Sequence, residues 1–323
     1  MRLKKEDKTI TIGKEQIAAG EDKLVKIKID RLPTGTLIDI PLYVFNAKKP
    51  GPVILVQGGL HGDEINGIEI VRRMLHKDYF KVDRGTVIAV PILNIFGFIH
   101  FSRDLPDGKD VNRSFPGTRK GSLASRIAYH FSKEIFPQID YAIDLHTGGA
   151  RRSNYPQIRY TAEDAKSVEL AEIFNAPITF ASNLIPKSFR KSAFRNNIPS
   201  IVYEAGESMR FNQFAIETGI QGILNVLQSF EMLKSKHTSK KEKTIHLTNR
   251  KWLRAPTAGM FIPNIKNGTV INQGDLLGVI TDAFDKRNKE IIAPLTGYVF
   301  CVNHQAVVNQ GEALFHIGEE IES

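Results

Sequence analysis

The chain has 323 residues, 41 % of them hydrophobic, and a net charge of +9. This length suits one large domain and a smaller one, and the single cysteine, Cys301, excludes a disulfide framework within one chain. The charged N-terminus has no apolar segment behind it, which argues against a signal peptide. No apolar run approaches the roughly 18–20 residues of a membrane span. We therefore expect a cytoplasmic protein with no membrane partner.

Part of the basic excess lies in one run, KSKHTSKKEK, at residues 234–243. Basic runs bind nucleic acid or anionic surfaces in some proteins, but they more often form a solvated surface. No zinc finger, RNA-binding signature or set of stacking aromatics accompanies this run. We interpret it as a linker and expect no nucleic-acid partner.

The pattern of apolar residues changes along the chain. Residues 8–50 alternate between apolar and polar side chains, which predicts antiparallel strands. From residue 51 onward apolar strands alternate with helical segments, which predicts an α/β fold with a mixed, mostly parallel sheet flanked by helices. The predicted strands are PVILVQ, TVIAVPILN, YAIDLH, PITFA and SIVYEAG. The predicted helices lie at about 64–76, 122–136, 162–174, 188–196 and 211–233.

The last 70 residues contain an internal repeat. APTAGMFIPNIKNGTVINQGDLLGVI begins at Ala255, and APLTGYVFCVNHQAVVNQGEALFHI begins at Ala293. Two related β units predict a small pseudo-symmetric barrel or sandwich, and each half resembles the biotinyl/lipoyl-carrier fold. Lys286 and Lys289 lie between the halves, but DKRNKE lacks the flanking hydrophobic residues of a modified lysine. We therefore favour a structural or substrate-shaping module over a carrier.

Chemically active side chains follow three of the predicted strands. His61 and Glu64 come after PVILVQ, His146 ends YAIDLH, and Glu204 ends SIVYEAG. The carboxyl ends of parallel strands meet at one edge of an α/β sheet. Burying four such groups without partners would be costly, so we expect them to form a site.

The physical interpretation of this set is a catalytic zinc site. Two histidines and one glutamate, His61, His146 and Glu64, leave the fourth tetrahedral position open. Zinc polarises a carbonyl and lowers the pKa of water, and Glu204 would act as the general base. Asp144 precedes His146 by two residues and therefore shares its strand face, where it could orient the imidazole or be held by backbone amides. Other divalent ions fit similar sites.

A loop at residues 102–117, SRDLPDGKDVNRSFPG, supplies candidate substrate contacts. A guanidinium binds a carboxylate in a bidentate way, so Asn112 and Arg113 could hold a substrate carboxylate. Arg103 could stabilise the oxyanion at the scissile carbonyl. Arg152 and Arg159 follow the strand of His146 and could meet a second carboxylate. The alternative for each is a solvated surface residue.

Taken in order, these motifs resemble the succinylglutamate desuccinylase/aspartoacylase family, which belongs with the zinc carboxypeptidases. They are H61-x-x-E64, N112-R113-S-F-P-G, D144-L-H146 and E204, and the resemblance covers roughly residues 50–235. The C-terminal repeat also looks like that family's C-terminal domain. The resemblance implies one Zn²⁺ per chain on His61, Glu64 and His146, a catalytic Glu204, and carboxylate recognition by Asn112 and Arg113. It also implies an oxyanion residue at Arg103.

Residue ranges for four segments follow from this organisation. They are the N-terminal strands joined to the catalytic domain (1–50), a zinc hydrolase domain (51–233), a basic linker (234–250) and a β-rich C-terminal domain (251–323).

We expect hydrolysis of an amide bond in a carboxylate-bearing substrate, chiefly deacylation of a small N-acyl amino acid. The alternatives are a carboxypeptidase that removes C-terminal glutamate from an acidic peptide or protein tail, and a degenerate binding protein. The sequence is also compatible with assembly of this chain into a homo-oligomer.

Overall fold

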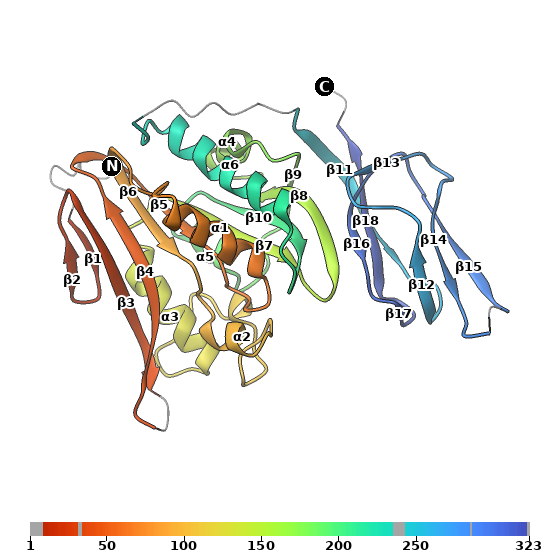
Figure 1. The fold of residues 1–323 in the computed structure, drawn as a ribbon, viewed down its shortest axis with the longest axis horizontal. Coiled ribbons are helices and arrows are strands. Elements are labelled where there is room, and N and C mark those ends of the chain that lie inside the picture. Colours follow the sequence, from red (N-terminus) through yellow and green to blue (C-terminus); the bar gives the residue numbers. More distant parts are fainter. Residues whose placement is uncertain (1–8, 32–33, 235–242, 285, 322–323) are drawn as a thin grey trace.

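The computed structural model describes residues 9–31, 34–234, 243–284 and 286–321. Figure 1 shows two parts: an α/β part, and a β-rich module that follows it at the C-terminal end. None of the described helices is long and apolar enough to cross a membrane.

The α/β part contains ten strands and six α-helices in the described residues. Its strands are β1 (Ile10–Ile12), β2 (Glu15–Ile17), β3 (Glu21–Arg31), β4 (Leu37–Asn46), β5 (Lys49–Gln57), β6 (Arg84–Val90), β7 (Tyr141–Gly148), β8 (Arg152–Tyr160), β9 (Ile178–Ala181) and β10 (Ser200–Glu207). Its helices are α1 (Ile65–His76), α2 (Ile95–Ile99), α3 (Leu123–Ile135), α4 (Ala165–Phe174), α5 (Phe189–Arg195) and α6 (Gln213–Ser229), with a 3₁₀ turn, η1, at Val111–Arg113. Each of the five predicted helices has a counterpart here; α2 and η1 were not predicted.

The large sheet is mixed, as predicted, but the expectation that it is mostly parallel is wrong, because antiparallel pairings outnumber parallel ones. Its twelve strands follow the order β13-β16-β18-β11-β9-β8-β10-β7-β5-β6-β4-β3, where the strands above β10 belong to the module. Strands β6, β5, β7 and β10 are parallel neighbours. Strands β4 and β3 continue the sheet antiparallel at one side, and β8 pairs antiparallel with β10 at the other.

Strand β8 was not predicted, and the turn before it explains its direction. Residues 149–151 reverse the chain between β7 and β8, with φ of 54° at Ala150 and 59° at Arg151. A strand that follows so short a turn runs antiparallel to the preceding strand. The sequence of β8, RSNYPQIRY, is polar and contains a proline. It therefore lacks the apolar, β-branched run that marks the other strands.

Alternate side chains of β5 enter two separate cores. Val53 and Leu55 belong to the core that also contains residues of α3 and α5. Ile54 and Val56 belong to the core that contains residues of α1, α4 and α6. These three helices cover one side of the sheet in Figure 1. A strand buried on both faces is apolar throughout, and its position is fixed by both helix layers. The turn at its carboxyl end is therefore held firmly.

The module is all-β in its described residues. Its strands are β11 (Ile245–Arg254), β12 (Gly259–Pro263), β13 (Thr269–Ile271), β14 (Leu276–Thr281), β15 (Asn288–Ile292), β16 (Gly297–Asn303), β17 (Val307–Val308) and β18 (Ala313–Glu320). The two sequence repeats exchange strands, because β13 of the first pairs with β16 of the second and β17 of the second pairs with β12 of the first. Phe261 and Ile280 from one sheet and Val299 and Ile317 from the other share one core.

The module is joined to the α/β part by strand pairing. Strand β11 runs parallel to β9, and β16 runs antiparallel to β8. A small apolar cluster, containing Phe180 of β9 and Phe300 of β16, fills the junction. The large sheet is thus continuous between the two parts, and the predicted domain boundaries remain a prediction.

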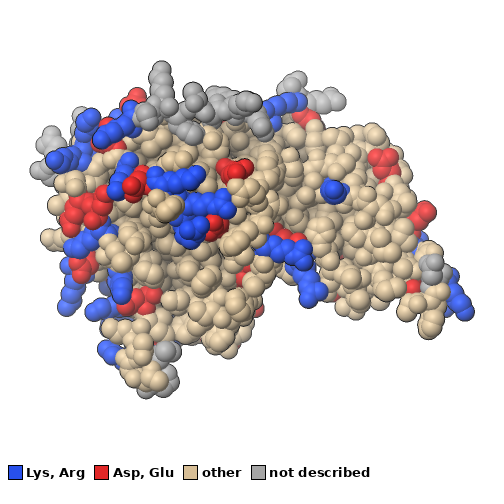
Figure 2. All heavy atoms as spheres, in the orientation of Figure 1, with Lys and Arg blue, Asp and Glu red and all other residues tan. Residues whose placement is uncertain are grey.

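Charged side chains of both signs are mixed on the face shown in Figure 2, and most of them lie over the α/β part. Residues 235–242 of the basic run lie outside the described residues. The flanking Lys234 and Lys243 pair with Asp83 and Glu320. Lys286 and Lys289, which lie between the repeats, are exposed.

Candidate active site

The turn between β5 and α1 carries His61 and Glu64. Glu64 occupies the N-cap position of α1, yet its side chain makes no capping hydrogen bond. Its carboxylate is instead directed toward two histidines. Both His61 and Glu64 are 2 % exposed, so the chain buries an acid and an imidazole directly after its central strand.

Gly62 lets α2 pack against this turn. A Cβ atom placed on Gly62 would lie 1.8 Å from the carbonyl carbon of Gly97 in α2. No side-chain rotation can relieve a clash with backbone, so any larger residue must push the turn and the helix apart.

We expect Gly62→Ala to destabilise the fold by about 1–3 kcal/mol, the usual cost of overfilling a packed region, and to weaken metal binding. Thermal unfolding and zinc content would measure both effects. Gly149→Ala is the matched control, because its Cβ would meet its nearest neighbour at an ordinary 3.6 Å. Equal melting temperatures for the two variants would contradict this account of Gly62.

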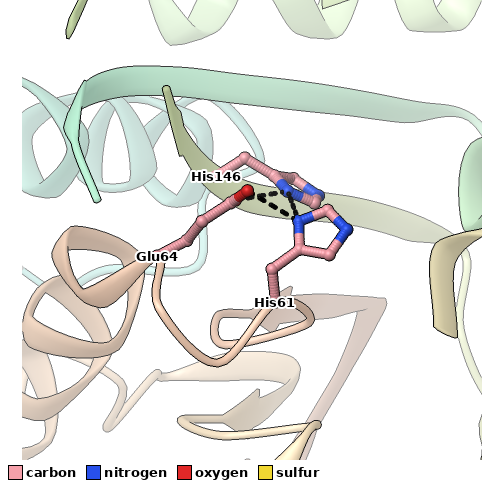
Figure 3. Close-up of side chains that lie close together, drawn as sticks. All are labelled: His61, Glu64 and His146. Atoms are coloured by element: carbon pink, nitrogen blue, oxygen red, sulfur yellow. Dashed lines mark hydrogen bonds and ion pairs between the residues drawn. The ribbon is translucent and has the colours of Figure 1, made fainter. Parts of the chain in front are cut away.

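Three buried side chains converge at the carboxyl ends of β5 and β7 (Figure 3). His61 Nδ1 lies 2.7 Å from Glu64 Oε1, and His146 Nδ1 lies 2.8 Å from Glu64 Oε2. The two Nδ1 atoms are 3.2 Å apart. One ligand atom from each residue can be chosen so that all three lie within 4.8 Å of one another. This is the grouping of His61, Glu64 and His146 predicted from the sequence.

The charges in this group favour a cation. Although burial opposes ionisation, the neighbouring His61 and His146 hold the pKa of Glu64 well below its usual value. Burial also opposes a charged His146, but Asp144 and Glu64 raise its pKa well above normal. A buried carboxylate therefore draws positive charge onto the rings. Two imidazole nitrogens and a carboxylate facing one another form a donor set that fits a divalent cation such as zinc.

Each histidine also faces a second carboxylate through its other ring nitrogen. His146 Nε2 lies 2.9 Å from Asp144 Oδ2, and Gln57 Nε2 donates to Asp144 Oδ1 at 2.9 Å. His61 Nε2 lies 3.2 Å from Asp110 Oδ1. Such carboxylates fix the orientation of metal-binding rings. Asp144 therefore lies where it can orient His146.

Asp110 was not singled out in the sequence. Although burial opposes its ionisation, His61 and Arg103 hold its pKa well below the usual value. The local sequence could at most suggest a capping role for this residue. Asp110 caps η1 by accepting a hydrogen bond from the backbone N–H of Asn112, which is a typical N-cap role. Its contact with His61 spans 49 residues and could not be read from spacing.

Arg103 lies at the edge of the metal-site group, by which we mean His61, Glu64 and His146. Its Nη1 lies 3.2 Å from Glu64 Oε1 and 3.3 Å from His61 Nδ1. Its Nη2 donates to Asp110 Oδ2 at 2.9 Å. The guanidinium is thus fixed beside the His61–Glu64–His146 group, and its oxyanion role stays a prediction.

Asn112 and Arg113 lie on η1 at the same cavity. Asn112 Oδ1 accepts a hydrogen bond from the backbone N–H of Phe189 at 2.8 Å, which ties η1 to the start of α5. Because its oxygen is used, Asn112 presents its amide NH₂ as a donor. Arg113 Nη1 donates to the carbonyl of Asn112 at 2.8 Å, and its side chain is 44 % exposed.

Glu204 lies beside His146 in the sheet. The two residues are register partners on the parallel strands β10 and β7, so the predicted meeting of strand ends is confirmed. Both carboxylate oxygens of Glu204 are held: Asn154 Nδ2 donates to Oε2 at 2.8 Å, and Arg159 Nη1 lies 3.2 Å from Oε1. Arg159, expected to meet substrate, thus also contacts the predicted base. Asn154 was not predicted, because β8 was missed.

All the residues singled out for the site line one cavity of about 440 Å³. They are His61, Glu64, Arg103, Asn112, Arg113, Asp144, His146, Arg152, Arg159 and Glu204. The structure brings them together, whereas their individual roles remain predictions. The lining also contains residues that sequence reasoning missed, among them Arg190 of α5 and, from the module, Trp252 and Cys301.

Arg190 is a buried cation at the cavity wall, 7 % exposed. It donates to the backbone carbonyls of Tyr160, Ser182 and Asn183. Burial and the nearby Arg159 lower its pKa to about 10. No motif marks this residue, since most of its partners are backbone carbonyls, which any residue type supplies.

The thiol of Cys301 is expected to be unreactive in the native protein. Cys301 is 1 % exposed, and burial raises its pKa to about 12. Because the thiolate is the reactive form, we expect iodoacetamide at pH 8 to label the unfolded chain quickly and the native chain very slowly. Intact mass measured with and without denaturant would show this. Rapid native labelling would contradict the burial of Cys301.

Comparison with known proteins identifies relatives of similar length. The model of the succinylglutamate desuccinylase/aspartoacylase catalytic domain matches residues 50–230. The N-alpha-acetyl-L-2,4-diaminobutyric acid deacetylase of Halomonas elongata is 26 % identical over 290 residues, which cover 84 % of this chain and 84 % of that protein.

Solved structures share the fold across both parts. A succinylglutamate desuccinylase/aspartoacylase from Rhodobacter sphaeroides is 26 % identical with a TM-score of 0.81, over 93 % of this chain and 96 % of that one. The product-bound ectoine utilization protein EutE (DoeB) from Ruegeria pomeroyi is 23 % identical with a TM-score of 0.83, over 98 % of this chain and 100 % of that one. The predicted family resemblance is confirmed. The matched segment covers more than half of the chain and carries the whole metal-site group, so the chain belongs to the succinylglutamate desuccinylase/aspartoacylase family.

Proposed function

We propose that this protein is a zinc-dependent hydrolase that deacylates a small N-acyl amino acid. The observation that carries the proposal is the cavity itself, in which the buried His61–Glu64–His146 group, Glu204 and the Asn112–Arg113 pair open onto one space. A volume of about 440 Å³ lies within the range typical of small-molecule sites. The relatives named for deacylation agree with this reaction class.

His61, Glu64 and His146 would hold one Zn²⁺. When bound, zinc would supply a Lewis acid that polarises the scissile carbonyl and acidifies water. Glu204 takes the proton from the attacking water and passes it to the leaving nitrogen, so that the C–N bond breaks and a carboxylate and an amine are released. Arg103 stabilises the negative charge that develops on the carbonyl oxygen.

The substrate's free carboxylate would bind Asn112 and Arg113. Asn112 offers its amide NH₂, because its oxygen is held by Phe189. Arg113 offers a guanidinium at the same η1 turn, whose planar fork matches a carboxylate. Both donors belong to one rigid turn, which fixes the distance between the carboxylate and the scissile bond.

The charge of the lining favours a second carboxylate on the substrate. Five arginines line the cavity: Arg103, Arg113, Arg152, Arg159 and Arg190. Among the described lining residues the only carboxylates are Glu64, Asp144 and Glu204, and the proposal assigns all three to the metal site or the chemistry. A cationic side chain, such as that of the diaminobutyrate named for the Halomonas relative, would find no free acid. An anionic side chain or acyl group would meet Arg152 or Arg159.

A carboxypeptidase acting on glutamate-ended peptides uses the same residues. It requires room for a peptide beyond the scissile bond, where Trp252 of the module contributes to the cavity wall. This wall favours the small-molecule substrate. A binding protein without activity would retain the cavity but turn nothing over.

The test is turnover by zinc-loaded protein on a mixed panel, followed by mass spectrometry. The panel contains N-acetyl-aspartate, N-succinyl-glutamate, N-acetyl-2,4-diaminobutyrate, neutral N-acyl amino acids and short glutamate-ended peptides. Release of a free amino acid from an acidic N-acyl amino acid is the expected result. Cleavage of the peptides alone would establish the carboxypeptidase instead. No turnover at full zinc occupancy would overturn the hydrolase proposal.

A further inference from the structure

Arg152, the first residue of β8, is held on two sides. Its Nε donates to the carbonyl of Gly149 at 3.1 Å. Its guanidinium lies over the ring of Trp252, 5.8 Å from the ring centroid, within the range of a cation–π contact. One edge and one face of the guanidinium are therefore fixed, while Nη1 and Nη2 stay free of both contacts. Arg152 and Trp252 both line the cavity.

Trp252 is itself part of an aromatic stack. Its ring lies parallel to His316, with centroids 4.1 Å apart and an interplanar angle of 15°. His316 packs on Phe300 at 4.2 Å, and Phe300 packs on Phe180 at 5.4 Å. Arg159 lies over Phe180 at 5.9 Å. The stack thus runs between the two arginines of β8 that face the cavity.

The module supplies the middle of this stack. Trp252 comes from β11, His316 from β18 and Phe300 from β16, whereas both arginines come from β8. Trp252 and His316 are register partners, and Arg152 is the register partner of Asn303 in β16. The sheet pairing therefore places the rings and the arginines in fixed register. Burial and the nearby Arg159 and Arg250 lower the pKa of His316 to about 3, so this ring stays neutral between the cations.

We propose that Trp252 is a positioning residue for Arg152, through which the C-terminal module sets the recognition of a second carboxylate on the substrate. The inference rests on the proposed function for the identity of the substrate. Without the indole face, the guanidinium keeps only the Gly149 contact among the described residues and can rotate away from the cavity. A long, flexible side chain that must be ordered on binding loses affinity. The effect is confined to ligands that use Arg152.

The test measures binding of non-hydrolysable product-like probes to zinc-loaded protein by calorimetry. The probes are two dicarboxylates, each with a monocarboxylate partner: L-aspartate with L-asparagine, whose side chain is neutral, and succinate with butyrate. The variants are Trp252→Leu, which fills space without a π face, Trp252→Phe, which keeps a smaller one, Arg152→Met, and the Trp252→Leu/Arg152→Met double variant. Melting temperatures identify any variant that does not fold.

We expect Trp252→Leu to raise the Kd of the better-bound dicarboxylate probe about tenfold and that of its monocarboxylate partner less than about twofold, given the strength of a cation–π contact. Trp252→Phe should recover most of the loss. In the Arg152→Met background, Trp252→Leu should add less than about twofold, because coupled residues are not additive. Equal losses for the dicarboxylate and its monocarboxylate partner, additive losses, or a wild type that does not prefer the dicarboxylate would each overturn the inference. Absence of turnover on the N-acyl panel with these binding differences intact would overturn the proposed function alone.

Discussion

Glu204→Gln is expected to lower kcat by about 10²–10⁴-fold, the usual contribution of a positioned general base. Glutamine keeps the size of the side chain and can still accept from Asn154 Nδ2, which donates to Glu204 Oε2 at 2.8 Å. It cannot take a proton from water. The fold and the metal-site group should therefore persist while the chemical step fails. Single-turnover rates on the cleaved substrate would measure the loss, and zinc content would show that the site stays filled.

Glu207→Gln is the matched control, since it makes the same chemical change three residues along β10. Glu207 does not line the cavity, and we expect its variant to retain wild-type kcat. A Glu204→Gln protein with wild-type kcat and full zinc occupancy would exclude Glu204 as the base. Loss of zinc in that variant would instead indicate that Glu204 supports the metal site.

The position of the metal-site group could be predicted because it depends on local sequence and one rule of sheet geometry. His61 and Glu64 follow one buried strand, and His146 ends another. In parallel neighbours these ends lie together. The register of Glu204 beside His146 extends the same rule to β10. This prediction does not depend on contacts between distant residues. It depends only on the polar side chains that follow or end the apolar strands.

The antiparallel strand β8 and the residues that depend on it required information that the pattern did not contain. Asn154 reaches Glu204 only because a tight turn at 149–151 folds β8 back beside β10. The pair Gly148–Gly149 is a turn signal, but it does not show that the chain returns as a strand, and the left-handed conformations fall on Ala150 and Arg151, where they are uncommon. The expectation of alternating strands and helices therefore passed over this segment.

Contacts between the two parts of the chain were also beyond prediction. Trp252 reads as one apolar residue in a β-rich module, and Arg152 reads as a loop arginine. Their meeting depends on the pairing of β16 with β8, which joins segments about 150 residues apart. The repeat in the sequence predicts two related halves, and their strands pair with one another in the module. It did not show that one sheet of the module would continue the large sheet up to the cavity.

His146→Ala is expected to remove zinc from the protein and to abolish hydrolysis. The variant leaves one imidazole and one carboxylate, and catalytic zinc sites ordinarily use three protein ligands. The substitution also leaves two buried carboxylates without this partner: Asp144 Oδ2 loses the ring nitrogen 2.9 Å away, and Glu64 Oε2 loses the ring nitrogen 2.8 Å away. Zinc content after exhaustive dialysis, together with kcat on the cleaved substrate, would measure the outcome.

Two further variants make this prediction specific to the ligand. Asp144→Asn keeps the ring of His146 but weakens its orientation, and we expect a loss of about 10–100-fold in zinc affinity, smaller than that of His146→Ala. His100→Ala removes an exposed histidine at the end of α2 and should retain one zinc per chain. If His146→Ala kept stoichiometric zinc, the cation would not be held by this group. Glu64 is buried between the two rings, so its negative charge is balanced either by a bound cation or by protonated histidines. The zinc content distinguishes these two cases. Without a cation, the raised pKa values of His61 and His146 favour protonated rings as the partners of Glu64, and zinc uptake would then release those protons.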